Sequence, residues 1–232
     1  MKLKYKKMVI LATIIAMALG FVALIFLDNG GTNNNAADAA LDLNKNEDIK
    51  KLIESYFAAQ KTVNTEAMSE LVSDANRIPK EKYMIKASYI EDYKDFDCYH
   101  IKNTEMDAYR VYVRYKMKLK NIESWVPCLT RYYIKVTSEG KYVIYFSALD
   151  DAEVEFINSA DKNDEIQKLK EDVNKELKEI LDKDATFKQF YQKMQKEIKA
   201  AANAAAVSAS PSGTPAATVA PTAAATAAPA TN

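Results

Sequence analysis

An unbroken apolar run near the start of the chain decides where the rest of the chain lies. Residues 8–27 contain no charged side chain, and four lysines precede them: Lys2, Lys4, Lys6 and Lys7. As a helix, a run of this length spans roughly 30 Å, the thickness of the hydrocarbon core of a bilayer. Lysines on one flank favour keeping that flank in the cytoplasm. The sequence therefore predicts a cytoplasmic N-terminus at 1–7, a single-pass transmembrane anchor in the cell membrane at 8–27, and an extracytoplasmic remainder.

A cleaved signal peptide is the alternative interpretation of this run. The apolar core of a signal peptide is usually about 7 to 15 residues long, and small residues follow it at the cleavage site. The run here is longer, Asp28 follows it directly, and the nearest small-residue spacing is at 37–39. These features favour an uncleaved anchor. Cleavage would deliver the chain to the same compartment as a released protein.

Two low-complexity segments flank the part of the chain that can fold. Residues 28–46 are small and polar without an apolar period, which is typical of a flexible tether. Residues 201–232 carry no charge and are rich in Ala, Pro and Thr, which predicts a disordered tail. That tail is either a stalk in the cell wall or an inert solubilising segment. Residues 47–148 then form an α+β domain, and residues 149–200 form a helical extension.

The charge balance argues against a nucleic-acid partner. The formal net charge is zero, and beyond the four N-terminal lysines the chain has 28 basic and 32 acidic residues. Only four of the basic residues are arginine, the residue type that binds phosphate through two parallel hydrogen bonds. We therefore expect no nucleic-acid binding.

Helical periodicity opens the foldable region. Apolar residues recur at helical spacing, at Ile49, Leu52, Ile53, Tyr56 and Phe57. This pattern predicts an amphipathic helix, and Asn46 is a good N-cap for it. A second, short helix is expected to start at Asn64 or Thr65, and Pro79 marks a turn.

The segment from residue 83 to residue 146 has the composition of a sheet, with eleven of the fourteen tyrosines. Its clearest strand is 109–119, where apolar and polar residues alternate, so one face is expected to be buried and the other wet. Further strands are expected at 89–102, 128–136 and 141–146, joined by short links as an antiparallel meander. Gly140 supplies the positive φ of a tight turn before the last strand.

The region after Asp150 returns to helical periodicity in two stripes. One comprises Ile166, Leu169, Val173, Leu177, Ile180 and Leu181, and the other comprises Phe187, Phe190, Tyr191, Met194 and Ile198. Thr186 is a candidate cap for the second helix. The stripes either pack against each other and the sheet, or they form a coiled-coil site for a partner.

The runs 49–73 and 108–145 together resemble the cystatin-like α+β fold, in particular the nuclear transport factor 2-like cone. The run 89–102 and the strand start at 127–129 are also similar to membrane-anchored clostridial proteins of unassigned function. The resemblance implies an N-terminal helix packed on a curled antiparallel four-stranded sheet. It also implies a pocket between helix and sheet, for which Tyr56, Phe57 and Tyr115 are the candidate lining residues.

Catalytic residues are not apparent in this pattern. His100 is the only histidine, which excludes a multi-histidine metal site within one chain. Asp95 and Asp97 share a strand with Tyr99, and we expect them on a wet face or at a sheet edge. The sequence therefore predicts no metal, no cofactor and no enzymatic activity. The alternative is a small lyase or isomerase, because enzymes on the resembled cone place Asp, Tyr or His in its pocket.

Cys98 and Cys128 are the only cysteines, in a compartment where disulfides form. A meander puts them on its first and third strands, about 9.5 Å apart, beyond the roughly 7 Å that a disulfide spans between Cα atoms. We expect them to remain unpaired. A different strand order or a curled edge would bring them together.

A basic sheet surface is the last candidate site. Its residues are Arg110, Arg114, Lys116, Lys118 and Arg131. This surface either binds a polyanion such as a wall polymer, or it is neutralised by acidic residues of the C-terminal helices. The sequence thus predicts an extracytoplasmic binding or interaction module of the cell envelope, whose partner is an envelope protein, a wall polymer or a small ligand.

Overall fold

The computed structural model describes residues 42–43 and 45–208, with side chains to residue 197. In chain order the elements are β1 (Asp42–Leu43), α2 (Glu47–Thr62), α3 (Thr65–Ser69), a 3₁₀ turn (Ala75–Arg77), α4 (Lys80–Tyr89), β2 (Ile90–Asn103), β3 (Ala108–Leu119), β4 (Trp125–Val136), β5 (Tyr142–Ile144), α5 (Asp151–Asp161), α6 (Asp164–Lys183) and α7 (Ala185–Ser208). None of the helices in these ranges is long and apolar enough to span a bilayer. The expected anchor at 8–27 and most of the expected tail lie outside the described residues.

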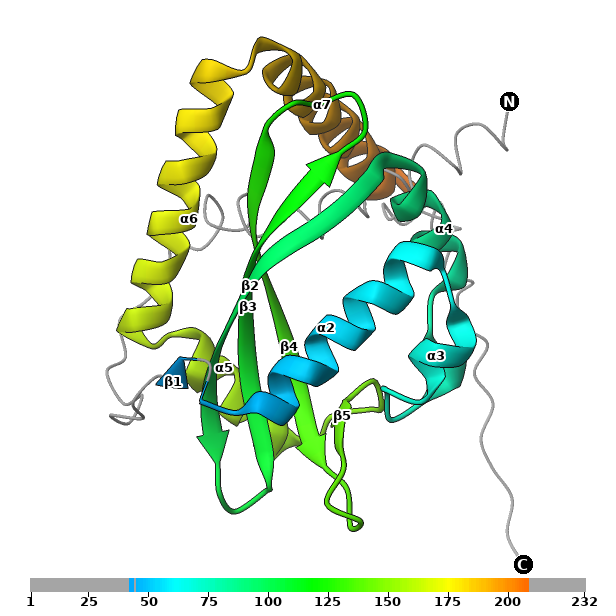
Figure 1. Cartoon of the computed structure of the whole chain (residues 1–232), viewed down its shortest axis with the longest axis vertical. Helices are drawn as coiled ribbons and strands as arrows, with labels where there is room; N and C mark the ends of the chain where they lie inside the picture. Colours follow the sequence, from blue (N-terminus) through cyan, green and yellow to red (C-terminus); the bar gives the residue numbers. More distant parts are fainter. Residues whose placement is uncertain (1–41, 44, 209–232) are drawn as a thin grey trace, which may run out of the picture.

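The five strands form one antiparallel sheet in the order β1-β2-β3-β4-β5, so the meander and the α+β class are confirmed (Figure 1). Four strands were expected, and the additional one is β1, which pairs Asp42 with His100 at the edge of β2. It lies within 28–46, where a flexible tether was expected. The sheet is only mildly curled, which falls short of the strong curl that a cone requires.

One face of the sheet is covered by α2, as the apolar stripe predicted. Asn46 caps the helix, because its Oδ1 accepts hydrogen bonds from the backbone N–H groups of Asp48 and Ile49. The side chains of Tyr56 and Phe57 are fully buried against β3, which contributes alternate residues from Tyr109 to Leu119 to the same core. Burial of side chains of this size stabilises a fold by about 1.5–3 kcal/mol each.

Helix α4 corrects the expectation of sheet structure from residue 83. The segment 80–89 is helical and begins after Pro79, whose missing N–H is no loss at a helix start. No residue of α4 is fully buried. Its apolar pattern is therefore weak, and its tyrosines gave the segment a strand-like composition.

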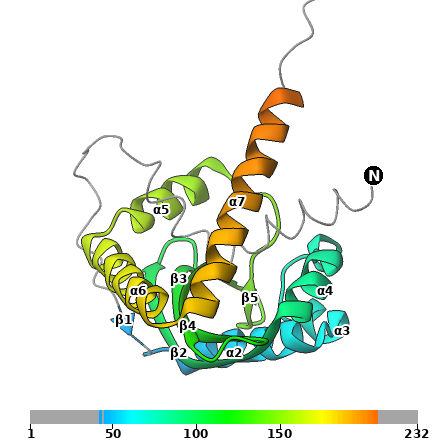
Figure 2. The same cartoon turned by 90° about the horizontal axis from the view of Figure 1, so that it is seen from above.

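The opposite face of the sheet is not wet, which corrects a second expectation. Helices α5 and α6 lie on this face, on the side away from α2 (Figure 2). Ile166, Leu169 and Val173 of α6 pack there against Tyr112, which is fully buried. The first apolar stripe of the C-terminal region therefore packs on the sheet, in agreement with one of the two expectations for it.

Helix α7 runs from the end of α6 across one end of the sheet (Figure 1). Phe187 and Met194 are buried in the core on the α2 side. The cap of α7 is Asp184 rather than Thr186, since Asp184 Oδ1 accepts from the Phe187 N–H at 2.8 Å. The helix continues to Ser208, beyond the boundary expected at residue 200.

Strand β2 carries a β-bulge that breaks its register with β3 between Lys94 and Asp97. Asp95 in this bulge has φ 55°, a left-handed conformation that non-glycine residues adopt rarely. The bulge turns Phe96 toward the core, where its ring stacks on Tyr115 at 5.8 Å between centroids. It thus bends the strand and adds one ring to the core beneath α2.

Candidate functional site

Six polar or aromatic side chains meet between α2, α4 and the sheet, and we call them the Lys86 cluster. Its members are Tyr56, Gln60, Tyr83, Lys86, Tyr93 and Tyr132. Gln60 and Tyr56 are buried, whereas Tyr83, Lys86, Tyr93 and Tyr132 are half-buried. The cluster is therefore partly exposed.

The Lys86 amine lies among aromatic rings. Its Nζ is 5.8 Å from the ring centroid of Phe57 and 5.6 Å from that of Tyr93, and it donates to Gln60 Oε1 at 3.1 Å. Within residues 42–43 and 45–197, no carboxylate oxygen is within 4.0 Å of it. Burial lowers the pKa of Lys86 to about 8, because removal from water penalises the charged form.

A chain of hydrogen bonds leads away from Lys86. Gln60 Oε1 accepts from Lys86, and the Gln60 side chain also acts on the Tyr56 and Tyr132 hydroxyls, where it offsets part of the rise in their pKa. The Tyr56 and Tyr83 hydroxyl oxygens are 2.6 Å apart. Burial raises the pKa of all three tyrosines, which keeps them protonated as donors.

The three residues expected to line a pocket lie next to this cluster or beneath it. Tyr56 belongs to the cluster, and Phe57 contacts Lys86 through its ring. Tyr115 lies deeper, with its ring centroid 4.7 Å from that of Phe57 and its hydroxyl 3.2 Å from Thr130 Oγ1. The rings of Phe57 and Tyr115 fill the interior, so the polar part of this region lies toward α4.

The expected basic face is neutralised by residues of the protein itself. The Asp161 carboxylate accepts from Arg110 Nε at 2.8 Å, from Arg110 Nη2 at 2.9 Å, from Tyr112 Oη at 2.7 Å and from Arg131 Nη1 at 2.5 Å. Arg114 pairs with Glu176 of α6. The structure thus agrees with the expectation of neutralisation by the C-terminal helices.

The two remaining residues of that face lie beyond α6 and have partners of their own. Lys116 Nζ is 3.0 Å from Asp95 Oδ2, and Lys118 Nζ donates to the Glu123 carbonyl oxygen at 2.5 Å. Both lysines keep partial or full exposure. With every member paired and its centre covered by helices, the basic face presents no continuous surface for a polyanion.

Electrostatics explain how Asp161 stays charged in this position. Burial alone would raise the pKa of Asp161, but hydrogen bonds and charge from Arg110, together with Tyr112 and Arg131, outweigh burial and lower it. A carboxylate with three such donors is stable as the anion. Asp161 at the end of α5 therefore ties the helical extension to β3 and β4.

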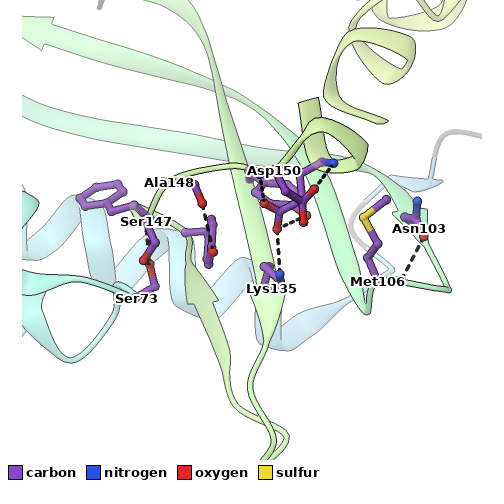
Figure 3. A network of polar contacts seen from close by, with 11 residues as sticks. Ser73, Asn103, Met106, Lys135, Ser147, Ala148 and Asp150 are labelled. Atoms are coloured by element: carbon purple, nitrogen blue, oxygen red, sulfur yellow. Dashed lines mark hydrogen bonds and ion pairs between the residues drawn. The ribbon is translucent and has the colours of Figure 1, made fainter. Parts of the chain in front are cut away.

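A second polar network fixes the start of α5 (Figure 3). Asp150 and Glu153 form a capping box, in which each side chain accepts a hydrogen bond from the backbone N–H of the other. Glu153 is buried and also accepts from Lys135 Nζ at 2.7 Å and from Tyr133 Oη at 3.2 Å. Nearby, Ser73 and Ser147 join the α3 loop to the chain after β5, with 3.1 Å between their Oγ atoms. These bonds are structural and offer no reactive group to solvent.

The other candidates for chemistry lie apart from the Lys86 cluster. His100 is buried with its ring centroid 5.6 Å from that of Tyr109, and burial lowers its pKa. Asp95 is exposed, paired with Lys116, while Asp97 and Tyr99 are half-buried. In the described part of the chain, no three His, Cys, Asp or Glu side chains come together as a metal site.

Both cysteines are buried in the core, and no disulfide joins them. Cys98 is opposite Val113 on β3, and Cys128 is opposite Tyr115 on the other side of β3, so one strand separates them. Burial raises the pKa of each thiol to about 12. Neither is an activated nucleophile.

Lys86 and Gln60 were not among the site residues predicted from the sequence. A lysine inside a ring cluster has the same sequence signature as a surface lysine, and α4 was not recognised as a helix. In a helix over residues 80–89, Tyr83 and Lys86 are three residues apart and lie on one face. This spacing is the signal in the sequence that could have identified Lys86. Comparison with known proteins gave no match for this chain among family models, curated proteins or solved structures.

Proposed function

We propose that this chain is a membrane-anchored, extracytoplasmic binding module of the cell envelope, and that the Lys86 cluster is its binding site. The observation that carries the proposal is the Lys86 amine, which lies among rings with one amide acceptor and no carboxylate within 4.0 Å in the described residues. Such a group destabilises a fold, because a cation that is partly removed from water without a counter-charge is costly. A binding role gives a reason for keeping it.

The packing of α2 on the sheet supports the same location for the site. In chain order α2, the short helix α3 and α4 precede the antiparallel strands β2 to β5, and α2 packs across one face of the sheet. The other face is closed by α5 and α6, which leaves the α2 and α4 side for a ligand. The apolar run at 8–27 and the lysines before it support the membrane location.

A small lyase or isomerase is the second candidate function. The observation in its favour is the pKa of Lys86, about 8, which leaves part of the amine neutral near pH 7.5. A neutral amine beside tyrosine hydroxyls is able to take up a proton from a bound substrate. Turnover of a ligand, rather than its retention, would distinguish the enzyme from the binding module.

Protease accessibility on intact cells, combined with cross-linking pull-down of the full-length chain, tests the main proposal. Cleavage between residues 45 and 200 by external protease is expected, together with an envelope component that is recovered with the wild type and lost with Lys86→Met. Lys80→Met is the matched control, since Lys80 is exposed at the start of the same helix. Protection of the whole chain from protease would overturn the location, and equal recovery with Lys86→Met would overturn the site.

A further inference from the structure

We propose that the Lys86 cluster binds a small monoanionic carboxylate with an aromatic or apolar body. This inference rests on the proposed function and names its ligand class. The cluster combines one cation, tyrosine hydroxyls and ring walls, and it lacks a carboxylate of its own within the described residues. A carboxylate carries the charge and the acceptor atoms that this set requires.

The direction of the hydrogen bonds limits the ligand to an acceptor. Gln60 Oε1 accepts from Lys86, and the Tyr56 and Tyr83 hydroxyl oxygens are 2.6 Å apart, with one hydroxyl donating to the other. Only one of these two hydroxyl protons is used between them, so the other is left for a further acceptor. Lys86 uses one N–H for Gln60 and keeps two.

The number of positive charges limits the ligand to a single negative charge. Lys86 is the only cation in the cluster, and the four arginines of the chain are occupied elsewhere. Arg77 bonds the Phe146 carbonyl, Arg110 and Arg131 bond Asp161, and Arg114 bonds Glu176. Sites for phosphate usually supply an arginine fork or a helix N-terminus. A monoanion fits one ammonium better than a phosphate dianion does.

The walls of the cluster favour an apolar body on the ligand. Phe57 contacts Tyr93 at 5.0 Å and Tyr132 at 6.3 Å between ring centroids, both nearly perpendicular. Edge-to-face ring pairs of this kind can accept another ring at their exposed side. Because Tyr93 and Tyr132 are half-buried, part of each ring remains available to a ligand.

Helix α4 provides the route by which a ligand reaches Lys86. No residue of α4 is fully buried, and Pro79 at its start gives no side-chain cap. A helix held this weakly can shift outward at low cost, in contrast to α2, which buries seven residues. Tyr83 and Lys86 would move with α4 and close on the carboxylate together.

The test uses the full-length chain in a neutral detergent, with 4-fluorobenzoate as the probe and 4-fluorobenzamide as its neutral isostere. Fluorine NMR line broadening measures the binding of each. We expect the benzoate to bind at least tenfold more tightly than the benzamide, because a hydrogen bond to a charged group is worth a factor of this order. Lys86→Met should remove that preference, and Lys80→Met should leave it unchanged.

A second variant covers the case in which Lys86→Met does not fold. Tyr83→Phe removes one donor and retains the ring, and it should weaken benzoate binding by about threefold to tenfold. Equal binding of benzoate and benzamide, an unchanged preference in Lys86→Met, or no broadening at about 10 mM benzoate would each overturn the carboxylate assignment. If the pull-down still recovers an envelope component that depends on Lys86, the proposed binding function is retained. Only the assignment of a carboxylate as the ligand is then wrong.

Discussion

The carboxylate of Asp161 is bidentate to the guanidinium of Arg110, at 2.8 Å from Nε and 2.9 Å from Nη2. Asp161 is the last residue of α5, and Arg110 is near the start of β3, so this pair joins the helical extension to the sheet. Both side chains are largely buried, with 9% of Arg110 and 16% of Asp161 exposed. The extension and the sheet are therefore linked electrostatically as well as by apolar packing.

Asp161→Asn should destabilise the protein strongly. The substitution leaves Arg110 buried without a counter-charge, and removal of one partner of such a pair typically costs about 3–5 kcal/mol. Urea unfolding followed by circular dichroism measures the change. Glu176→Gln is the matched control, because Glu176 and Arg114 are about one-third exposed and an exposed pair contributes at most about 1 kcal/mol. Equal effects of the two substitutions would contradict the assigned role of Asp161.

Acid should weaken the wild type more than Asp161→Asn. The pKa of Asp161 is lowered in the fold, so its contribution is fully present above the unfolded pKa of about 3.9 and is lost as pH falls through the folded value. Urea midpoints at pH 7, 4 and 3 should therefore converge for the two proteins. A constant difference between the two urea midpoints from pH 7 to pH 3 would contradict the lowered pKa of Asp161.

Lys86→Met should stabilise the protein at neutral pH. The pKa of Lys86 falls from 10.5 to about 8 on folding, so the charged amine opposes folding below pH 8, and this penalty fades between pH 8 and 10.5. After loss of the bond to Gln60, a net gain of about 1–2 kcal/mol is expected at pH 7. The gain should shrink toward pH 10 in urea unfolding, whereas Lys80→Met should match the wild type throughout. A gain that stays constant with pH would rule out the lowered pKa.

Both cysteines should be unreactive in the folded protein. Burial raises the pKa of Cys98 and Cys128 to about 12 and removes them from solvent. A colorimetric thiol reagent at pH 8 should detect no thiol in the native protein and two in urea without a reductant. Finding no thiol in urea would show that the two cysteines are paired in the cell, against the strand separation described above.

Gly140→Ala should cost about 1–2 kcal/mol through the backbone alone. Gly140 has φ 77°, and a Cβ added there meets no atom within 4 Å, so the cost is conformational and not steric. Glu139→Ala in the same exposed turn is the control and should change little. Thermal unfolding distinguishes them, and an unchanged midpoint for Gly140→Ala would mean that the turn relaxes.

The elements with one strong period were predictable from the sequence. The start of α2 at its cap Asn46 and the bounds of β3 were predicted to within one residue. The apolar residues of each element follow a single periodic pattern. The antiparallel order followed from short links. These are local properties, which a sequence records directly.

The elements that depend on distant partners were not predictable. Arg110 and Arg114 alternate with apolar residues as a wet face would. Neutralisation of this face by the C-terminal helices was one of the two expectations, but the individual pairs, Arg110 with Asp161 and Arg114 with Glu176, are set by the fold. Helix α4 has no buried stripe to reveal it, so Lys86 was not singled out from the sequence. A weakly amphipathic helix leaves no local signature, and the candidate site depends on this helix.

The bulge at Asp95 also affects how neighbouring copies of this chain meet. Strand β1 covers β2 only opposite Tyr99 and His100, so in the described sheet the first half of β2 is an open edge. That half carries Glu91, Asp92, Lys94, Asp95 and Asp97 and is bent by the bulge. Two such edges would present like charges on mismatched curves, which opposes edge-to-edge pairing of two copies of the chain.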